Sequence, residues 1–293
     1  MKLSPDSEAI VGATAGVVAE HAEQITSVFY PTMFAAPPEL LNVFNTANQA
    51  VGEQPKALAA SVVAFAVQLP DPNAPDFTPV MRRIAHKHVS LGIKAREYTI
   101  VGRFLLDAVG TVLGAAVTPE VRAAWDEVYW LFATELIAQE AALYALGGTN
   151  PEEPWREYRV VERDEESTDI FSLVIAPVEG HVPTHDTGQY VAISVTLPDG
   201  SRQPRQYTIS SGPRRDSLRV TIKRVHGAAG VPDGIVSNWL YEHARPGAIL
   251  DVSQPAGDVV LDNTEAPLVL VSAGIGITPV AAILEDLSRR QPD

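Results

Sequence analysis

The spacing of apolar residues changes near Gly147, and this change limits the possible folds more than any other feature. Before Gly147 apolar side chains recur three and four residues apart, as in Ile10, Ala13 and Val17. After it they tend to alternate with polar ones, as in residues 158–163. The first spacing is that of an α-helix and the second that of a half-buried strand. The sequence therefore predicts an all-α domain followed by a β-rich domain.

The first 147 residues read as helices separated by clusters of Pro, Gly and Asn. No strand is expected here. An all-α domain of this size packs its helices around a shared core and commonly leaves an internal pocket. After two N-terminal segments with helical spacing, we expect helices over 56–69, 80–91, 96–114 and 119–146.

The segment Gly147-Gly148-Thr149-Asn150-Pro151 ends the last of these helices and reads as a domain junction. Short β-rich runs separated by turn residues then fill residues 148–265, which is typical of an antiparallel barrel. These runs cover 158–163, 171–175, 190–195, 206–210 and 218–225.

A third kind of sequence pattern begins near Pro267. An apolar run at 268–271 predicts a strand, a glycine loop follows, and Thr278-Pro279 predicts the capped start of a helix. This is the first β-loop-α unit of a doubly wound α/β domain. A parallel sheet needs a second strand, and none follows in residues 266–293. We therefore expect this third domain to be incomplete.

The net charge and the hydropathy of the chain limit the classes of molecule that it is expected to bind. A net charge of −14 would repel nucleic acid and an anionic membrane surface alike. We see no leader sequence and no apolar run of the roughly 18 residues that a membrane span requires. The expectation is a cytoplasmic protein with no transmembrane segment, with its oligomeric state open and a monomer as the default.

The chain has no cysteine. This excludes disulfides, iron–sulfur clusters, thiolate-bound haem and a cysteine nucleophile. A metal would have to bind to His, Asp or Glu, and redox chemistry would depend on organic or haem cofactors.

Two histidines, His86 and His88, lie in the predicted helix 80–91. Two residues apart on a helix, they point about 200° away from each other, so only one can face a shared pocket. Ile84 and Leu91 place His88 on the apolar face, whereas His86 is expected to share a side with Arg82 and Arg83. On spacing alone, a histidine such as His88 on an apolar helix face is more often a core residue than a metal ligand.

Several segments in order resemble bacterial flavohaemoglobins over essentially the whole chain. These are Phe29-Tyr30-Pro31-Thr32-Met33-Phe34, Asn45 to Asn48, Gly52-Glu53-Gln54, Lys87-His88 and Tyr98-x-x-Val101-Gly102. The resemblance implies a globin domain with His88 as the proximal ligand of haem iron. It also implies that Tyr30 and Gln54 reach over the distal face, and that Phe44 and Leu58 wall the pocket.

By the same resemblance, Tyr98 and Glu140 form a hydrogen-bonded relay behind His88. A carboxylate near an imidazole pushes electron density to the iron and favours activation of O₂ over its carriage. Lys87 would add a positive charge beside the ligand. The Tyr30 hydroxyl can donate to bound O₂. A half-buried surface tyrosine, a solvated glutamate and a core aromatic remain the plainer readings of Tyr98, Glu140 and Tyr30.

Residues 148–265 resemble the FAD-binding barrel of ferredoxin-reductase-like enzymes. The motif Arg205-Gln206-Tyr207-Thr208 places Arg205 and Tyr207 on one side of a strand, where they can grip the FAD pyrophosphate and pack on the isoalloxazine. Thr208 would lie near the flavin N5. Gly188-Gln189-Tyr190-Val191 matches a second flavin-contacting strand. Lys223 and the helix start at Ser237 would meet the phosphates, while Trp239 reads as a plug of the barrel.

The glycine loop follows the order found in NAD(P)H-dependent flavin reductases. It would cradle the pyrophosphate of NAD(P)H on backbone N–H groups. Its residues are Gly274, Ile275, Gly276, Ile277, Thr278 and Pro279.

Together these features imply a nitric oxide dioxygenase that uses haem, FAD and NAD(P)H, with O₂ and NO as substrates. Two alternatives stay open. One is a haem protein that binds or senses O₂ or NO beside a non-functional reductase. The other is a chain whose apolar edge at 268–271 recruits a partner.

Overall fold

The computed structural model describes residues 2–35, 53–69, 73–227, 232–261 and 267–290. The chain divides into two compact units. The first comprises Met1–Ala85 and Ile93–Ala141, and the second comprises His86–Gly92 and Ala142–Asp293. The last turns of one helix, α5, therefore belong to the second unit.

The helical part contains α1 (Pro5–Glu20), α2 (Ala22–Ala35), α4 (Glu53–Gln68), α5 (Thr78–Leu91), α6 (Glu97–Leu113) and α7 (Pro119–Gly147), with a short 3₁₀ turn at Gly114–Ala116. Within the described residues before the junction no strand occurs, as predicted. Ser4 caps α1 by accepting a hydrogen bond from the Ser7 backbone N–H, and Pro5 opens the helix. The helical core is built on fully buried side chains of Val11, Phe29, Met33, Val128 and Leu136.

One helical stretch of the described chain, Glu97–Ala116, is long and apolar enough to cross a membrane by length and composition alone. The sequence analysis found no such run, because Glu97, Arg103 and Asp107 interrupt it. Tyr98, Gly102, Leu105 and the other buried residues of α6 face the helical core. Buried residues make up 28% of the apolar window, so packing accounts for part of the apolar character of α6.

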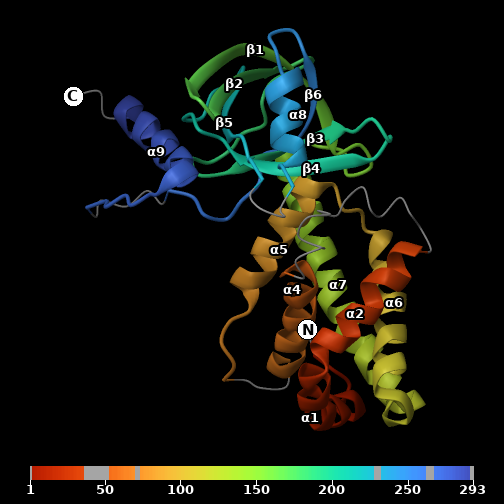
Figure 1. The fold of residues 1–293 in the computed structure, drawn as a ribbon. Helices are drawn as coiled ribbons and strands as arrows, with labels where there is room; N and C mark the ends of the chain where they lie inside the picture. The colour runs from red at the N-terminus through yellow and green to blue at the C-terminus, as the bar shows by residue number, and fades with distance from the viewer. Residues whose placement is uncertain (1, 36–52, 70–72, 228–231, 262–266, 291–293) are drawn as a thin grey trace. The chain divides into compact units, whose positions relative to one another are not determined.

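The β-rich part forms an antiparallel sheet (Figure 1), which among the described residues runs in the order β4-β3-β6-β1-β2-β5. An Ile209–Val220 bridge, with the Ser210 N–H donating to the Arg219 carbonyl at 2.7 Å, connects the two outer strands and closes a barrel. The predicted barrel is confirmed. Its strands are β1 (Trp155–Ser167), β2 (Ile170–Pro177), β3 (Tyr190–Thr196), β4 (Arg202–Thr208), β5 (Leu218–Lys223) and β6 (Ile249–Ser253).

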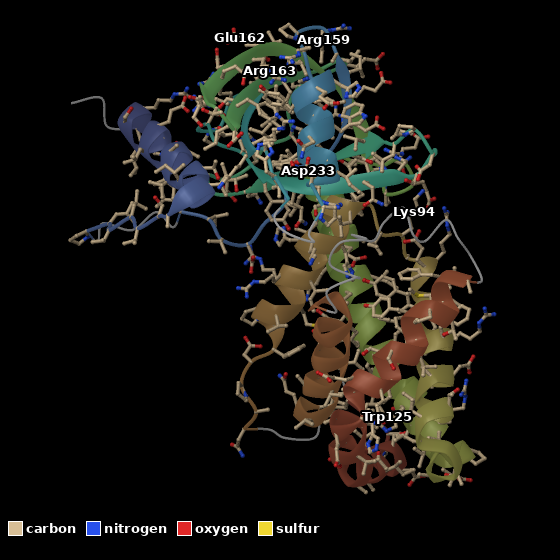
Figure 2. The ribbon with its side chains drawn as sticks, viewed as in Figure 1. Lys94, Trp125, Arg159, Glu162, Arg163 and Asp233 are labelled. Carbon is tan, nitrogen blue, oxygen red and sulfur yellow. The ribbon has the colours of Figure 1, made fainter. Side chains whose placement is uncertain are left out.

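Helix α8 (Ile235–His243) packs Val236 and Leu240 into the barrel core. Arg163 of β1, labelled in Figure 2, caps this helix. Its guanidinium donates to the Tyr241 carbonyl at 2.8 Å and the Ala244 carbonyl at 3.2 Å, and lies 4.5 Å from the centre of the Phe171 ring. A buried arginine thus satisfies carbonyls that the end of a helix leaves unpaired. Trp239 packs partly buried against the core, as expected of a plug.

The C-terminal segment departs from the sequence prediction. Residues 267–273 form no strand, and Val269 and Val271 are 83% and 87% exposed. A strand is stabilised by hydrogen bonds to a neighbour, and no described strand pairs with this run. The loop forms a 3₁₀ turn at Gly274–Gly276, followed by α9 (Ile277–Arg290). The predicted cap was wrong: Thr278 lies inside α9, and its hydroxyl donates to the Ile275 carbonyl.

Candidate functional site

Tyr30, the predicted distal residue, is buried on α2 with 6% of its surface exposed. Its ring packs edge-on against Phe29, with 4.7 Å between ring centres, and against Phe34 at 5.7 Å. Burial raises the pKa of its hydroxyl well above the ordinary value. The hydroxyl therefore stays protonated and able to donate a hydrogen bond at neutral pH.

The other predicted distal residues cannot be placed. Phe44 lies outside the described residues, as does the motif Asn45 to Asn48. Gln54 and Leu58 lie on α4, but their side chains are outside the described part.

Helix α5 carries both histidines, and their burial differs from the expected arrangement. His86, predicted to lie with the exposed Arg82 and Arg83, is instead 5% exposed. In the second unit its Nδ1 accepts a hydrogen bond from the Gly257 backbone N–H at 3.0 Å. The prediction was wrong because sequence periodicity does not show what covers a helix turn. His88 is half-buried near the end of α5, and Lys87 is exposed.

Tyr98 and Glu140 come together in the first unit, from α6 and α7. Both are buried, and the Tyr98 hydroxyl donates to Oε1 of Glu140 at 2.5 Å. Burial, followed by the nearby Glu140 charge, raises the pKa of Tyr98. The backbone carbonyl of Tyr98 accepts a hydrogen bond from the Tyr129 hydroxyl, also at 2.5 Å. This chain of hydrogen bonds holds the carboxylate of Glu140 in one orientation.

The flavin motif lies on β4. Arg205 pairs with Ile193 and Tyr207 with Val191 across the β3–β4 ladder, so the two side chains emerge on one face of the strand. The Arg205 guanidinium donates to the Pro204 carbonyl at 2.7 Å, and burial lowers its pKa. Tyr207 is half-buried against the barrel core, and burial raises its pKa. Thr208 is half-buried and faces Tyr190, and Gln206 is exposed.

Two glycines allow the loop before β3 to approach residues 256–260. Gly188 has φ +109°, and a Cβ there would lie 2.5 Å from the Val259 carbonyl oxygen. Gly257 has φ +122°, and its Cβ would lie 3.1 Å from the Tyr190 ring. No L-residue fits either place without strain. The motif Gly188-Gln189-Tyr190 therefore depends on both glycines for the position of the Tyr190 ring.

Of the two residues predicted to contact the FAD phosphates, Ser237 and Lys223, the first forms hydrogen bonds within the protein. The Ser237 hydroxyl accepts from the Val225 N–H at 3.1 Å and donates to the Gly234 carbonyl. It fastens the start of α8 to the strand that precedes it. Lys223 is exposed at the end of β5. In the glycine loop at 274–279, which is predicted to bind NAD(P)H, Ile275 and Ile277 are 37% and 48% exposed.

The last turns of α5 contact the flavin motif inside the second unit. The Gln206 side-chain amide donates to the Ser90 hydroxyl at 2.7 Å, and Tyr190 also hydrogen-bonds to Ser90. Together with the His86–Gly257 bond, these contacts tie the segment that carries His88 to β3, β4 and residue 257.

Comparison with known proteins agrees with both halves. A globin family model matches residues 27–136. The flavohemoproteins of Bordetella parapertussis and Deinococcus radiodurans are each 43% identical over 98% of this chain, covering 72% and 70% of their own lengths. The chain belongs to the flavohemoprotein family. A crystal structure of the flavohemoglobin from Malassezia yamatoensis, with bound FAD and heme, matches with a TM-score of 0.87 and 35% identity over 99% of this chain and 75% of that one.

The residues of this flavohemoprotein fit a haem better than a chelated metal ion. Among the described residues, no three His, Asp or Glu side chains gather into a metal-binding group. An iron held by a porphyrin needs only one protein ligand, which a single half-buried imidazole such as His88 can provide. The fit to FAD rests on the Arg205 and Tyr207 side chains, which share one face of β4.

Sequence reasoning missed three residues of this flavohemoprotein that hold the candidate site together: His86, Ser90 and Gly257. Their contacts link segments more than 100 residues apart, |i−j| being 116 for Ser90–Gln206 and 171 for His86–Gly257. No local spacing encodes such a contact. The only hint was a histidine on an otherwise charged helix side.

Proposed function

We propose that this flavohemoprotein is an NAD(P)H-dependent nitric oxide dioxygenase that oxidises NO to nitrate with O₂. The observation that carries the proposal is the buried hydrogen bond between Tyr98 and Glu140. A carboxylate kept in place near a proximal imidazole favours activation of O₂ over its storage. In the proposal, this pair acts on His88.

The electron balance fits this assignment. Nitrogen loses three electrons between NO and nitrate, whereas O₂ takes up four. One further electron is needed for each NO, so one NAD(P)H, which gives a hydride, serves two NO molecules and releases one proton. When bound, FAD supplies the conversion of a two-electron donor into single electrons, and haem supplies an iron that binds O₂.

Each candidate residue has a separate task in the proposal. The Tyr30 hydroxyl, kept protonated by its raised pKa, donates a hydrogen bond to bound O₂. Arg205 binds the pyrophosphate of FAD, while the Tyr207 ring packs on the flavin. Gln206 and Tyr190 keep these two beside the α5 segment through Ser90. The backbone of residues 274–279 receives NAD(P)H.

Loss of the carboxylate tests the proposal. In the chain loaded with haem and FAD, Glu140→Gln should lower the rate of NADH-dependent NO consumption about 10–100-fold, as expected for a group that orients a metal ligand. Glu135→Gln is the matched control on the same helix, because the Glu135 carboxylate accepts a hydrogen bond from the Gln139 side chain one turn away and takes no part in the Tyr98–Glu140 pair. Equal rates of NO consumption and nitrate formation in the two variants would refute the role of Glu140.

A second candidate is a haem protein that binds or senses O₂ or NO without using NAD(P)H. The two candidates differ in whether NAD(P)H can reduce the haem. The candidates separate when haem reduction is followed under anaerobic conditions: reduction by NADH supports the dioxygenase, and reduction by dithionite alone supports the sensor.

A further inference from the structure

Two neighbouring carboxylates on α9 reach two different segments of the second unit. Asp286 is buried, and its Oδ2 accepts a hydrogen bond from the Thr187 hydroxyl at 2.6 Å. Glu285 accepts a hydrogen bond from the Gly212 backbone N–H at 3.1 Å and forms an ion pair with Arg214 at 2.6 Å. Consecutive residues of a helix point about 100° apart, so a single turn of α9 can hold both segments.

Both of these segments adjoin the predicted flavin motifs. Thr187 directly precedes Gly188-Gln189-Tyr190, and Gly212 follows the motif at 205–208 by four residues. A Cβ at Gly212 would lie 3.2 Å from the Asp286 backbone nitrogen, so α9 packs directly on this second segment. One helix therefore contacts the start of one predicted flavin-binding segment and the chain just beyond the other.

The contact between Thr187 and Asp286 is shielded from water, because both residues are buried. The Thr187 carbonyl also accepts a hydrogen bond from the Leu261 N–H at 3.1 Å. Arg290 holds the Asp286 carboxylate in place, with its Nε donating at 3.0 Å and its Nη2 lying 2.7 Å away. A buried hydrogen bond to a carboxylate is costly to lose, because the remaining partner stays desolvated. Thr187 and α9 thus hold each other in position.

The backbone between Thr187 and Tyr190 has little freedom to absorb a shift. The Gln189 side chain is buried and donates to the Gly257 carbonyl at 3.0 Å. Tyr190 and Ala256 exchange two backbone hydrogen bonds, each of 2.8 Å. A displacement of Thr187 should therefore be passed on to the Tyr190 ring.

We propose that α9 is a positioning element of the flavin site, in which Asp286 acts through Thr187 to fix the segment that presents the Tyr190 ring to FAD. Glu285 acts in the same way on the segment that follows the motif at 205–208. The inference rests on the proposed function for the place of FAD, and it extends that function to residues of α9. Because α9 begins in the loop predicted to receive NAD(P)H, this helix connects that loop with both flavin segments.

Calorimetric titration of FAD into the full chain tests the proposal. Thr187→Val keeps the shape of the side chain and removes its hydroxyl, so it should weaken FAD binding about tenfold, as expected for one hydrogen bond to a charged group. Thr187→Ser keeps the hydroxyl and should retain the affinity of the unmodified protein. Thr196→Val is the matched control, because Thr196 is exposed at the opposite end of β3 from Tyr190.

The control variant should bind FAD like the unmodified protein. Equal FAD affinity in the unmodified protein and Thr187→Val would overturn the proposal. A loss in Thr187→Ser as large as in Thr187→Val would also overturn it, because the hydroxyl would then not be the group that matters.

Asp286→Ala tests the same hydrogen bond from the side of the helix. It replaces Thr187→Val if that variant does not fold, as judged by its thermal unfolding. If the two residues act through one bond, the double variant should bind FAD no more weakly than the weaker single variant. Losses of affinity that multiply would show that the residues act independently, which contradicts the proposal.

A spectroscopic readout separates positioning from general destabilisation. The difference in visible circular dichroism between the FAD-saturated and the FAD-free chain depends on the aromatic rings around the flavin. Thr187→Val should change this difference spectrum, whereas Thr187→Ser and Thr196→Val should keep it. An unchanged spectrum in Thr187→Val would mean that the surroundings of the flavin are not set by α9.

These outcomes are distinguishable from a failure of the proposed function. A chain that shows this pattern of FAD binding but consumes no NO refutes the dioxygenase and leaves the positioning role of Asp286 standing. Unchanged FAD affinity in Thr187→Val, in a chain whose NO consumption depends on Glu140, refutes the positioning role alone.

Discussion

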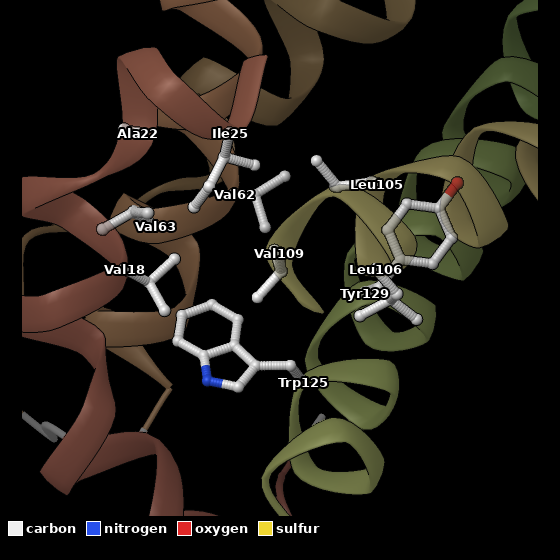
Figure 3. A pocket seen from close by; sticks show the side chains of 10 residues that line it. All are labelled: Val18, Ala22, Ile25, Val62, Val63, Leu105, Leu106, Val109, Trp125 and Tyr129. Atoms are coloured by element: carbon white, nitrogen blue, oxygen red, sulfur yellow. The ribbon is translucent and has the colours of Figure 1, made fainter. Parts of the chain in front are cut away.

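Gly102 of α6 packs directly against the ring of Tyr129 on α7, which is labelled in Figure 3. A Cβ at this position would lie 2.3 Å from the Tyr129 ring, nearer than any side chain can approach. Gly102→Ala should therefore destabilise the protein by about 1–3 kcal/mol through overpacking. It should also disturb the Tyr129–Tyr98 hydrogen bond. Denaturant unfolding measures the loss.

Gly110 supplies the control for this substitution on the same helix. Its added Cβ would meet only an Arg122 side-chain nitrogen, at 3.9 Å. Gly110→Ala should stabilise α6 by up to about 1 kcal/mol, the difference in helix propensity. Equal effects of the two substitutions would show that packing against Tyr129 does not constrain residue 102.

Tyr158 should make the stability of the barrel depend on pH in the alkaline range. It is fully buried, its hydroxyl has no hydrogen-bond partner among the residues that the structure describes, and burial raises its pKa to about 12. Because the pKa of Tyr158 in the folded state exceeds the unfolded value of about 10, the contribution of its protonated hydroxyl to the free energy of unfolding is fully present below pH 10. It is lost as pH rises from about 10 to 12, by an amount on the order of 3 kcal/mol.

Tyr158→Phe should remove this pH-dependent part of the free energy of unfolding. We expect the variant to be at least as stable as the parent at pH 8, since an unpaired buried hydroxyl is lost. Its advantage in unfolding free energy should grow between pH 10 and 12. A constant difference across this range would contradict the assigned pKa.

Among single residues, the sequence motifs predicted part of the candidate site. Tyr98 and Glu140 lie 42 residues apart, and the family resemblance paired them where composition could not. His86 was misplaced because the side of a helix that another segment covers is decided by tertiary contacts. The roles of His88, Tyr30 and Arg205 stay predictions.

At the element scale, the strands with clear alternation were predicted and the others were not. β1, β2, β3 and β5 contain apolar alternation or continuous apolar runs. β4 begins at Arg202, earlier than predicted, because its first half is polar and contains Pro204. β6 has only five residues and was missed. Both are strands because they pair with β3, a non-local fact.

Helix α9 is anchored to the second unit largely by polar contacts. Asp286 is buried on α9, where its Oδ2 accepts a hydrogen bond from the Thr187 hydroxyl at 2.6 Å and lies 2.7 Å from Arg290. Asp286→Ala leaves the buried Thr187 hydroxyl without this acceptor, which should cost about 1–3 kcal/mol locally. Hydrogen exchange of the amides in residues 277–290 should accelerate accordingly.

Arg289→Ala is the control, since Arg289 is exposed and its ion pair is with Glu285 of its own helix. An exposed pair of this kind contributes little. If both variants exchange alike, α9 is held by its apolar residue Ala282 rather than by Asp286.

At the scale of the whole molecule, the two cofactors should depend on different residues, so that the loss of one cofactor leaves the binding of the other intact. A ligand that binds only the folded state stabilises it by about 2.7 kcal/mol at one hundred times its dissociation constant. FAD should therefore raise the unfolding temperature of the barrel, and Arg205→Ala should abolish this shift while retaining the haem absorption band. His88→Ala should lose the haem band and keep the response to FAD.

The exposed Arg159 of β1 supplies the matched control for charge, because Arg159→Ala removes a guanidinium from the same unit away from the β4 motif. This variant should keep both the FAD shift and the haem band. The control is needed because the chain has a net charge of −14, so that the loss of any cation could weaken the binding of an anion such as FAD. If Arg205→Ala loses only the FAD shift and His88→Ala only the haem band, each cofactor depends on its own residue. A loss of the FAD shift in Arg159→Ala as large as in Arg205→Ala would mean that overall charge, and not a site on β4, governs flavin binding.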